Sequence, residues 1–309
     1  MAKASGKLSQ FKSDTQEVGV EWLKGFMQRH PELSLRIPEP TSMSRAVAFN
    51  KANVDKFFRI YQEELQKEQH SAERIWNVDE TGFTAVHKPG KILAKSGAKQ
   101  VGKITSGEKG VTTTAVCAVN AMGQYIPPML IYKRKRMNDI LLKGAPPGTI
   151  GGCSDNGWVT TELFLKWMKH FAHHAKPSKE KPILLLLDGH SSHKSLSTIE
   201  FARENGIIMI SFPPHSTHKM QPLDRTVYGP LKAAYNRKCD KWMTTTSRVG
   251  RRISVFDQAE LFGKAYIATA TMHNALSGFS CTGMWPYNPD VFQAEDFAPS
   301  LITEEELPG

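Results

Sequence analysis

With 309 residues, the chain is long enough to bury the core of one large domain and to carry a smaller one beside it. Its formal net charge of +10 favours a polyanionic partner such as DNA, and no apolar run is long enough to cross a bilayer. The four cysteines form no C-x-x-C pair, which argues against a disulfide framework or a thiolate zinc site. We therefore expect an intracellular protein, nuclear if it binds DNA, with neither a membrane nor a small molecule as its partner.

The first 70 residues combine a polar lead with helical patterns. Residues 1–14 are rich in serine and lysine and predict a disordered lead. Residues 15–70 repeat apolar side chains at helical spacing, with a first helix that stops at His30-Pro31 and a longer helix capped by Asn50. Arg29, Arg36, Arg45 and Lys51 lie among these helices. The segment predicts either a helix-turn-helix that reads DNA or a plain helical bundle or linker.

β-branched and apolar runs predict a sheet from about residue 71 onwards. Residues 74–79, 111–119 and 126–132 predict an antiparallel meander, in which Pro127-Pro128 indicates an edge strand or a bulge. Residues 183–187 are an unbroken apolar pentad, typical of a strand buried on both faces of an α/β sheet.

The remaining elements alternate with these strands. Residues 207–212 predict a further strand, whereas the glycine-rich residues 148–157 predict a loop. Helical spacing predicts a helix capped by Thr160 or Thr161, one around residues 196–204, one that begins at Pro222 and one over residues 255–276. The whole pattern predicts an α/β fold with a mixed sheet flanked by helices.

Three aspartates stand at the ends of predicted elements. Asp79 and Asp188 each end a strand, and Asp224 lies in the first turn of the helix that Pro222 begins. Open α/β sheets place their ligands at the carboxyl ends of the strands. Three close carboxylates repel one another unless divalent cations neutralise them, and oxygen ligands select Mg²⁺ or Mn²⁺. The alternative is three independent loop or helix-cap residues.

A pair of such ions can activate water and stabilise the leaving oxygen of a phosphodiester without a side-chain base. The predicted catalytic and metal-binding residues are therefore Asp79, Asp188 and Asp224. The residues expected to line their pocket are Glu80, His190, His193, His215 and His218. The four histidines form two H-x-x-H pairs, which leaves zinc binding open as an alternative.

Basic residues gather in two stretches of the larger domain. Lysines alternate with glycines between residues 88 and 109, which indicates a track for the phosphate backbone or a solvated loop. Residues 133–136 are all basic and indicate a nuclear-import signal, a DNA contact or an ordinary surface. The predicted DNA-binding residues are Arg29, Arg36, Arg45, Lys51, Lys95, Lys99, Lys103, Lys133 and Arg134.

Three sequence blocks resemble the catalytic blocks of pogo/Tigger/jerky-type transposases, which belong to the mariner–pogo superfamily of DDE endonucleases. The blocks are residues 76–83, 187–193 and 213–224, and each contains one of the three aspartates. Residues 156–159 and 282–289 also look like family segments. Residues 22–34 resemble the second helix-turn-helix of the centromere-protein-B-type DNA-binding region. We expect the first of that pair to be missing, because this chain begins too late to contain it.

The resemblance covers residues 15–295 and implies a partial helix-turn-helix segment at 15–70, an RNase H-like endonuclease domain at 71–295 and an acidic tail at 296–309. It implies that the three aspartates are catalytic, with two Mg²⁺ (or Mn²⁺) ions, in cut-and-paste transposition by a homodimer on DNA. Related domains have also been domesticated, so a nuclear DNA-binding or chromatin protein that keeps the fold without cleavage is the alternative. An RNase H-type nuclease is a third possibility.

Overall fold

The computed structural model describes residues 19–35, 48–86, 96–97, 111–245 and 251–301. The chain divides into two compact units, Met1–Ser42 and Met43–Gly309. In the smaller unit the described helix is α1 (Val20–Arg29), which stops at His30 as predicted. The predicted lead at residues 1–14 lies outside the described residues, as do residues 36–47, so the helix-turn-helix stays a prediction.

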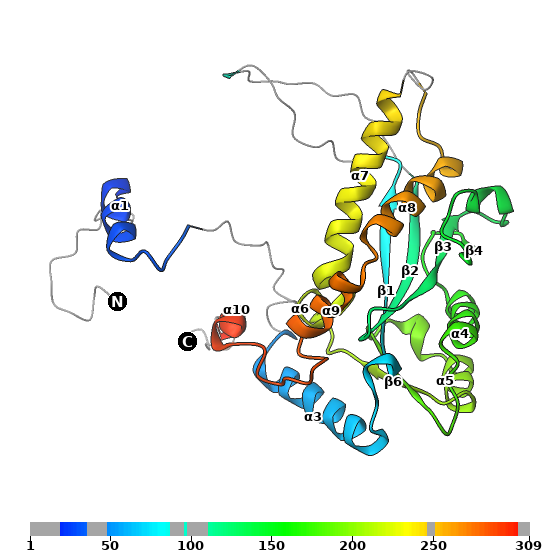
Figure 1. The fold of residues 1–309 in the computed structure, drawn as a ribbon, viewed down its shortest axis with the longest axis horizontal. Coiled ribbons are helices and arrows are strands. Elements are labelled where there is room, and N and C mark those ends of the chain that lie inside the picture. The colour runs from blue at the N-terminus through cyan, green and yellow to red at the C-terminus, as the bar shows by residue number, and fades with distance from the viewer. Residues whose placement is uncertain (1–18, 36–47, 87–95, 98–110, 246–250, 302–309) are drawn as a thin grey trace, which may run out of the picture. The chain divides into compact units, whose positions relative to one another are not determined.

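A six-stranded mixed sheet forms the centre of the larger unit, in the order β4-β3-β2-β1-β5-β6 (Figure 1). Its strands are β1 (Ile75–Thr84), β2 (Thr112–Asn120), β3 (Tyr125–Lys133), β4 (Ile150–Ser154), β5 (Ile183–Leu187) and β6 (Ile207–Ser211). The first three form the predicted antiparallel meander, while β5 joins β1, β6 joins β5 and β4 joins β3 in parallel. Every described strand except β2 therefore points the same way, and their carboxyl ends meet at one edge.

The hairpin between β2 and β3 decides how the two prolines are accommodated. The register shifts between Val116 and Ala118, so that Pro127 and Pro128 stand opposite Cys117 alone. Since β3 lies between β2 and β4, the prolines occupy a bulge and not an edge strand. A bulge suits them because proline has no N–H to donate to a neighbouring strand.

Strand β4 lies where the sequence predicts a loop, and that prediction is wrong. Residues Ile150–Ser154 pair in parallel with β3. The glycines that suggested a loop lie close to neighbouring side chains: a Cβ on Gly151 would lie 2.1 Å from the Met137 side chain, and one on Gly152 2.7 Å from the Leu163 side chain. Glycine is depleted in strands, so propensity alone favours a loop at this position.

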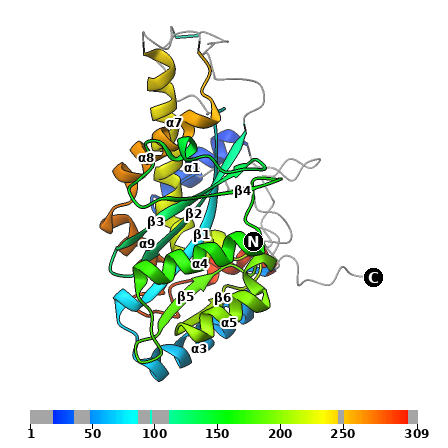
Figure 2. The same ribbon diagram turned by 90° about the vertical axis from the view of Figure 1, so that its right-hand side faces the viewer.

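Helices cover both faces of the sheet, with α4 and α5 on one side and α7 and α8 on the other (Figures 1 and 2). The helices of the larger unit are α3 (Lys51–Glu68), α4 (Thr161–Ala175), α5 (Leu196–Glu204), α6 (Thr217–Met220), α7 (Tyr228–Thr244), α8 (Val255–Thr269), α9 (Met272–Cys281) and α10 (Ala298–Leu301). Thr160 caps α4 as predicted. The single helix predicted over residues 255–276 is two helices, because Thr271 caps α9 after α8 has ended.

Helix α3 shares the core of the larger unit. Asn50 caps it as predicted, and its apolar stripe is buried. The Phe57 ring stacks on Phe212 with centroids 5.2 Å apart, and the Tyr61 hydroxyl donates to the Met284 carbonyl at 2.9 Å. The compact units divide after Ser42, whereas the sequence places the end of the helical segment after residue 70. Lys51 therefore lies on a helix that packs beside the sheet.

The predicted acidic tail begins within packed structure. It starts at residue 296, but Phe297 is buried and its ring stacks on Phe49 with centroids 5.1 Å apart. Residues 302–309 lie outside the described part of the chain. The described start of the tail therefore belongs to the core.

Alternating side chains divide the core into two layers. In β1, Ile75 and Phe83 pack in the layer of α3, α7 and α8, whereas Trp76 and Val78 pack in the layer of α4. Strand β5 is buried along its whole length and contributes to both layers, as its apolar pentad predicts. Because side chains alternate along a strand, Asp79 faces the α7 layer and Glu80 the α4 layer.

Candidate active site

Four carboxylates approach one another beside the carboxyl end of β5. Strand β1 continues to Thr84, so the prediction that Asp79 ends its strand is wrong. Asp79 and Glu80 lie in β1, Asp188 directly follows β5, and Asp224 lies in the short π-helical segment η5 (Leu223–Val227). Asp79, Glu80 and Asp188 line a cavity of about 270 Å³, together with Trp158, Val159 and His190. The chain thus brings acids from three separate elements to one place.

Asp79 has a strongly perturbed electrostatic environment. Burial raises its pKa well above the ordinary range, and repulsion from Asp224, Glu80 and Asp188 raises it further. A carboxyl group in this position holds its proton unless a positive charge compensates the neighbouring acids. The site therefore fits a divalent cation with oxygen ligands.

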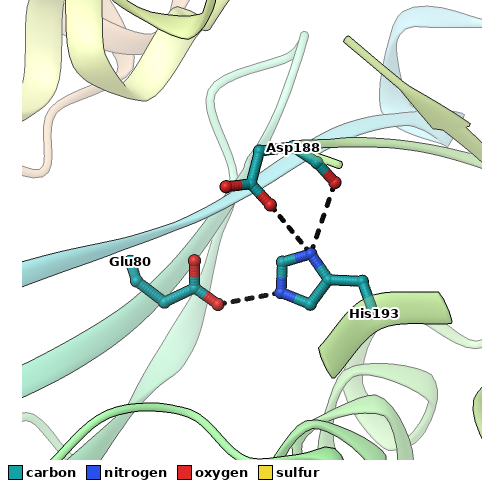
Figure 3. A group of neighbouring side chains, drawn as sticks. All are labelled: Glu80, Asp188 and His193. Atoms are coloured by element: carbon teal, nitrogen blue, oxygen red, sulfur yellow. Dashed lines mark hydrogen bonds and ion pairs between the residues drawn. The ribbon is translucent and has the colours of Figure 1, made fainter. Parts of the chain in front are cut away.

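A buried histidine joins two of the acids (Figure 3). The His193 side chain is 3% exposed; its Nε2 lies 3.1 Å from Glu80 Oε1 and its Nδ1 2.9 Å from Asp188 Oδ1. Burial alone would lower the pKa of His193, but the bonds to the two carboxylates raise it to about 10. Burial alone would raise the pKa of Asp188, yet the bonds from His193 and the His190 amide hold it below its usual value. The three groups therefore form an ion-paired bridge between β1 and the end of β5.

The bridge leaves part of each carboxylate available. Asp188 Oδ1 accepts both from His193 and from the His190 N–H at 3.0 Å, while no described residue bonds its Oδ2. Figure 3 shows the second oxygens of Asp188 and Glu80 directed away from the imidazole ring. Glu80, Asp188 and His193 have ligand atoms within 4.8 Å of one another. Because carboxylates engage both ring nitrogens of His193, we assign it to fixing these carboxylates and not to binding a metal.

The three predicted catalytic aspartates lie in one region, but they are less tightly grouped than Glu80, Asp188 and His193. Asp79 and Asp188 share the acidic cavity, and the charge of Asp224 acts directly on Asp79. In the part of the chain that the structure describes, they do not form a group as close as the bridge around His193. Asp224 is exposed, as expected for an acid at the rim of a site.

The predicted pocket-lining residues divide between several places. Glu80 and His190 line the acidic cavity, and His193 lies behind it. His215 adopts a left-handed φ of 57° and lines a neighbouring cavity, while His218 packs against the Phe49 ring at 6.2 Å. Among the described residues, no metal-ligating group contains both members of an H-x-x-H pair, so the zinc alternative gains no support.

The neighbouring cavity, of about 610 Å³, adjoins the acidic one and shares Asp188 and His190 with it. Its other walls come from α3, through Lys56, Phe57 and Ile60, and from the segment that follows β6. Lys194 contributes a second basic side chain. The cavity therefore combines two ammonium groups with an apolar wall, directly beside the acids.

The predicted DNA-binding residues are only partly described. Lys133 and Arg134 are exposed at the end of β3, and the Arg134 guanidinium lies 5.6 Å from the centre of the Phe256 ring. Arg29 is exposed in the last turn of α1, and Lys51 pairs with Asp55 at 2.8 Å. Arg36, Arg45, Lys95, Lys99 and Lys103 lie outside the described residues.

Several residues at the site were not singled out from the sequence. Trp158, in the family-like segment, lines the acidic cavity although its side chain is 53% exposed. Tyr228 donates its hydroxyl proton to the Asp79 carbonyl at 2.8 Å. Asn77 is fully buried in an otherwise apolar part of β1. Only Asn77 carried a usable signal, since a polar side chain in a buried strand needs hydrogen-bond partners.

The ion-paired histidine should make stability depend on pH. An unfolded histidine titrates near pH 6.5, whereas His193 in the folded chain titrates near 10. Because the folded pKa is raised, this stabilisation is complete below about pH 6.5 and is lost as pH rises toward the folded pKa. With a chelator present, we expect the Tm of the unmodified chain to fall over this window more steeply than that of a His193→Gln variant. Equal slopes would contradict the ion-paired bridge.

The fold and the acidic pocket together define an RNase H-like α/β protein with a candidate cation site. Comparison with known families agrees, because the family described as DDE superfamily endonuclease matches residues 109–281. This range contains Asp188 and Asp224 and begins after Asp79. The chain belongs to the DDE superfamily endonucleases.

Curated relatives match the chain over most of its length. The human protein named Pogo transposable element with KRAB domain is 24% identical over 235 residues, 72% of this chain and 36% of that protein. A Cochliobolus lunatus protein named MFS-type transporter clz9 is 31% identical over 229 residues, 71% of this chain and 24% of that protein. The chain thus spans well under half the length of these relatives. None of the described helices combines the length and apolarity needed to cross a membrane.

Solved structures share the fold at low sequence identity. The Mos1 strand transfer complex aligns with a TM-score of 0.55 at 11% identity and covers 99% of this chain and 76% of that one. The Mos1 paired-end complex with the left transposon end aligns with a TM-score of 0.54 at 10% identity and covers 87% and 69%. These likenesses confirm the predicted RNase H-like fold.

Proposed function

We propose that the chain is a divalent-metal-dependent DNA endonuclease and strand transferase that acts in cut-and-paste transposition. The observation that supports this most is the acidic pocket, in which Asp79, Glu80 and Asp188 line one cavity and burial, together with the neighbouring carboxylates, raises the pKa of Asp79. Family membership supplies the reaction class. The fold neighbours are Mos1 complexes, one of them a transposase with its left transposon end, which supports DNA as the substrate.

Asp79, Asp188 and Asp224 would hold two Mg²⁺ or Mn²⁺ ions, since their oxygens suit these hard cations. When bound, such ions supply the charge that activates a water and stabilises the leaving oxygen of the phosphodiester. The chain's own residues hold the carboxylates in place. His193 and the His190 amide fix Asp188 Oδ1 and leave Oδ2 for the pocket, while Glu80 anchors His193 from β1.

Basic and aromatic side chains around the pocket would guide the DNA strand. Lys56 and Lys194 line the cavity beside the acids and are placed to contact phosphates that flank the cut. The exposed Trp158 ring at the acidic cavity is suited to stack on a base. The basic residues 133–136 are exposed, which supports a role in DNA contact or in nuclear import. A homodimer on DNA would bring two such sites to the two ends of one element.

Replacing Lys56 with alanine should weaken DNA binding without unfolding the chain, because the side chain is exposed on α3. Each phosphate contact that is lost lowers the slope of log K against log salt by about 1. Fluorescence anisotropy with duplex DNA at several salt concentrations measures this slope. Lys67→Ala is a matched control on the same helix, because Lys67 lies near Glu64 and Glu68 and outside the cavity. Equal slopes for the two variants would show that Lys56, and the cavity wall that it forms, does not contact the DNA phosphates.

Nicking of DNA tests the proposal as a whole. The substrates are plasmid DNA and, if inverted repeats are found to flank the coding locus, DNA that carries them. We expect nicks with Mg²⁺ or Mn²⁺ and none with EDTA, because like-charged acids at the site need cations. DNA binding without cleavage under any divalent metal would instead indicate a domesticated DNA-binding protein. Preferential cleavage of an RNA–DNA hybrid would indicate an RNase H-type nuclease.

A further inference from the structure

The amide of Asn77 connects the main chains of three elements that carry the acids. Its Nδ2 donates to the Leu186 carbonyl of β5 at 3.1 Å and, within β1, to the Val78 carbonyl at 3.3 Å. Its Oδ1 accepts from the Leu223 N–H of η5 at 3.0 Å. The side chain is fully buried, so water does not compete for these bonds.

Each bond lies close to one of the predicted catalytic aspartates. Asn77 is two residues before Asp79, on the same face of β1; Leu186 is two residues before Asp188; Leu223 directly precedes Asp224. The Leu223 N–H lies at the start of the helical segment η5. A backbone donor in this position has no acceptor inside its own helical segment. Asn77 thus caps η5 from a neighbouring strand.

A second hydrogen bond holds the other end of η5. The Tyr228 hydroxyl, directly after η5, donates to the Asp79 carbonyl at 2.8 Å. Asp224 therefore lies between two attachments to β1, one before it and one after it. On the far side, α9 approaches closely, because Thr226 donates to the Asn274 carbonyl at 2.6 Å and a Cβ on Gly278 would lie 2.6 Å from Thr226.

These attachments act against electrostatic repulsion. Asp224 and Asp79 raise the energy of each other's charged form, so repulsion favours a movement of η5 away from β1. The hydrogen bond that Asn77 accepts from Leu223 and the one that Tyr228 donates to Asp79 hold the segment near β1 before any cation binds. Groups that orient metal ligands in this way affect metal affinity strongly without touching the ion.

We propose that Asn77 is a positioning residue that sets the place of Asp224 relative to Asp79 and Asp188, with Tyr228 as its counterpart at the other end of η5. This inference rests on the proposed function, since it assumes that the three aspartates share divalent cations. It concerns how the site is held in shape, and it can be measured by metal binding without any cleavage assay.

The experiment is a titration with Mn²⁺, with free Mn²⁺ measured by electron paramagnetic resonance. Asn77→Ala is expected to lower Mn²⁺ affinity by about 10- to 100-fold. Asn120→Ala is the matched control: Asn120 is equally buried in the same sheet, but its side chain bonds Glu73, Met122 and Gln124 around the β2–β3 turn. We expect it to lose Tm while keeping Mn²⁺ affinity within about twofold.

Two further variants test whether Asn77 acts through Asp224. In a chain that already carries Asp224→Asn, adding Asn77→Ala should change Mn²⁺ affinity by less than about twofold. The reason is that the Asp224 carboxylate, which Asn77 is proposed to position, is no longer present. Tyr228→Phe removes only one hydroxyl and serves if Asn77→Ala does not fold. Tyr228→Phe is also expected to lower Mn²⁺ affinity. This loss should likewise become small when Asp224→Asn is already present.

The possible results distinguish a failure of the positioning role of Asn77 from a failure of the proposed metal-dependent function. Equal Mn²⁺ affinities for Asn77→Ala, Tyr228→Phe and the unmodified chain would overturn the positioning role and leave the proposed function standing. Effects that simply add to that of Asp224→Asn would also overturn it. A chain that binds no Mn²⁺ in any variant would overturn the proposed function, and the role of Asn77 with it.

Discussion

Replacing Asp188 with asparagine is expected to lower the rate of metal-dependent DNA nicking by about 1000-fold or more, equal to about 4 kcal/mol of transition-state stabilisation. Asparagine keeps the size of the side chain but removes the negative charge that a divalent cation needs. It also removes the ionic partner of His193, which lies 2.9 Å from Asp188 Oδ1. Both effects reduce the ability of the pocket to hold cations.

Single-turnover nicking rates and Mn²⁺ affinity measured on the same preparation provide the test. Asp139→Asn is the matched control, since Asp139 is an exposed aspartate in the 3₁₀ turn Asp139–Leu142 and lines neither cavity at the site. It should nick at the unmodified rate. Nicking by Asp188→Asn within about tenfold of that rate would refute the proposed mechanism.

The largest expected effect on stability is that of Trp167→Ala. The Trp167 side chain is fully buried and packs between Phe164 and Phe171 on the inner face of α4, with ring centroids 5.5 and 5.2 Å away. Truncating a buried tryptophan to alanine costs about 3–5 kcal/mol, because transfer free energy is lost and a cavity is left. Urea unfolding followed by circular dichroism measures the difference in the free energy of unfolding.

Trp158→Ala is the natural comparison. This tryptophan is 53% exposed at the acidic cavity, so its removal should change the free energy of unfolding by less than about 0.5 kcal/mol. If Trp158 stacks on a base as proposed, DNA affinity falls instead. A loss of stability similar to that of Trp167→Ala would show that Trp158 belongs to the core.

Much of the fold could be predicted because local signals agreed with the final packing. The apolar pentad at residues 183–187 is a fully buried strand, and the helix caps at Asn50 and Thr160 are used as predicted. The positions of Asp188 after β5 and of Asp224 near the start of η5 followed from the same patterns, whereas Asp79 lies within β1, which continues to Thr84. That acids from distant segments approach one another follows from strand direction, since every described strand except β2 runs the same way.

Other features depend on contacts between distant segments and left no local signal. Strand β4 pairs with β3, and its Gly151 and Gly152 lie against the side chains of Met137 and Leu163. The bridge through His193 requires Glu80, which lies 113 positions earlier in the chain. Spacing in the sequence suggested an H-x-x-H metal pair at this place, but pairing with two carboxylates makes His193 a cation instead.

The adjacent acids Asp79 and Glu80 give β1 a strict requirement for alignment. They face opposite layers, one toward Asp224 and the other toward His193. A shift of β1 by a single position against β5 would exchange the two, because successive side chains alternate between the faces of a sheet. An inserted or deleted residue between Ile75 and Asp79 is therefore expected to abolish the proposed metal-dependent cleavage, although both acids remain in the chain. In this part of β1, the number of residues between Ile75 and Asp79 is therefore as important as their identity.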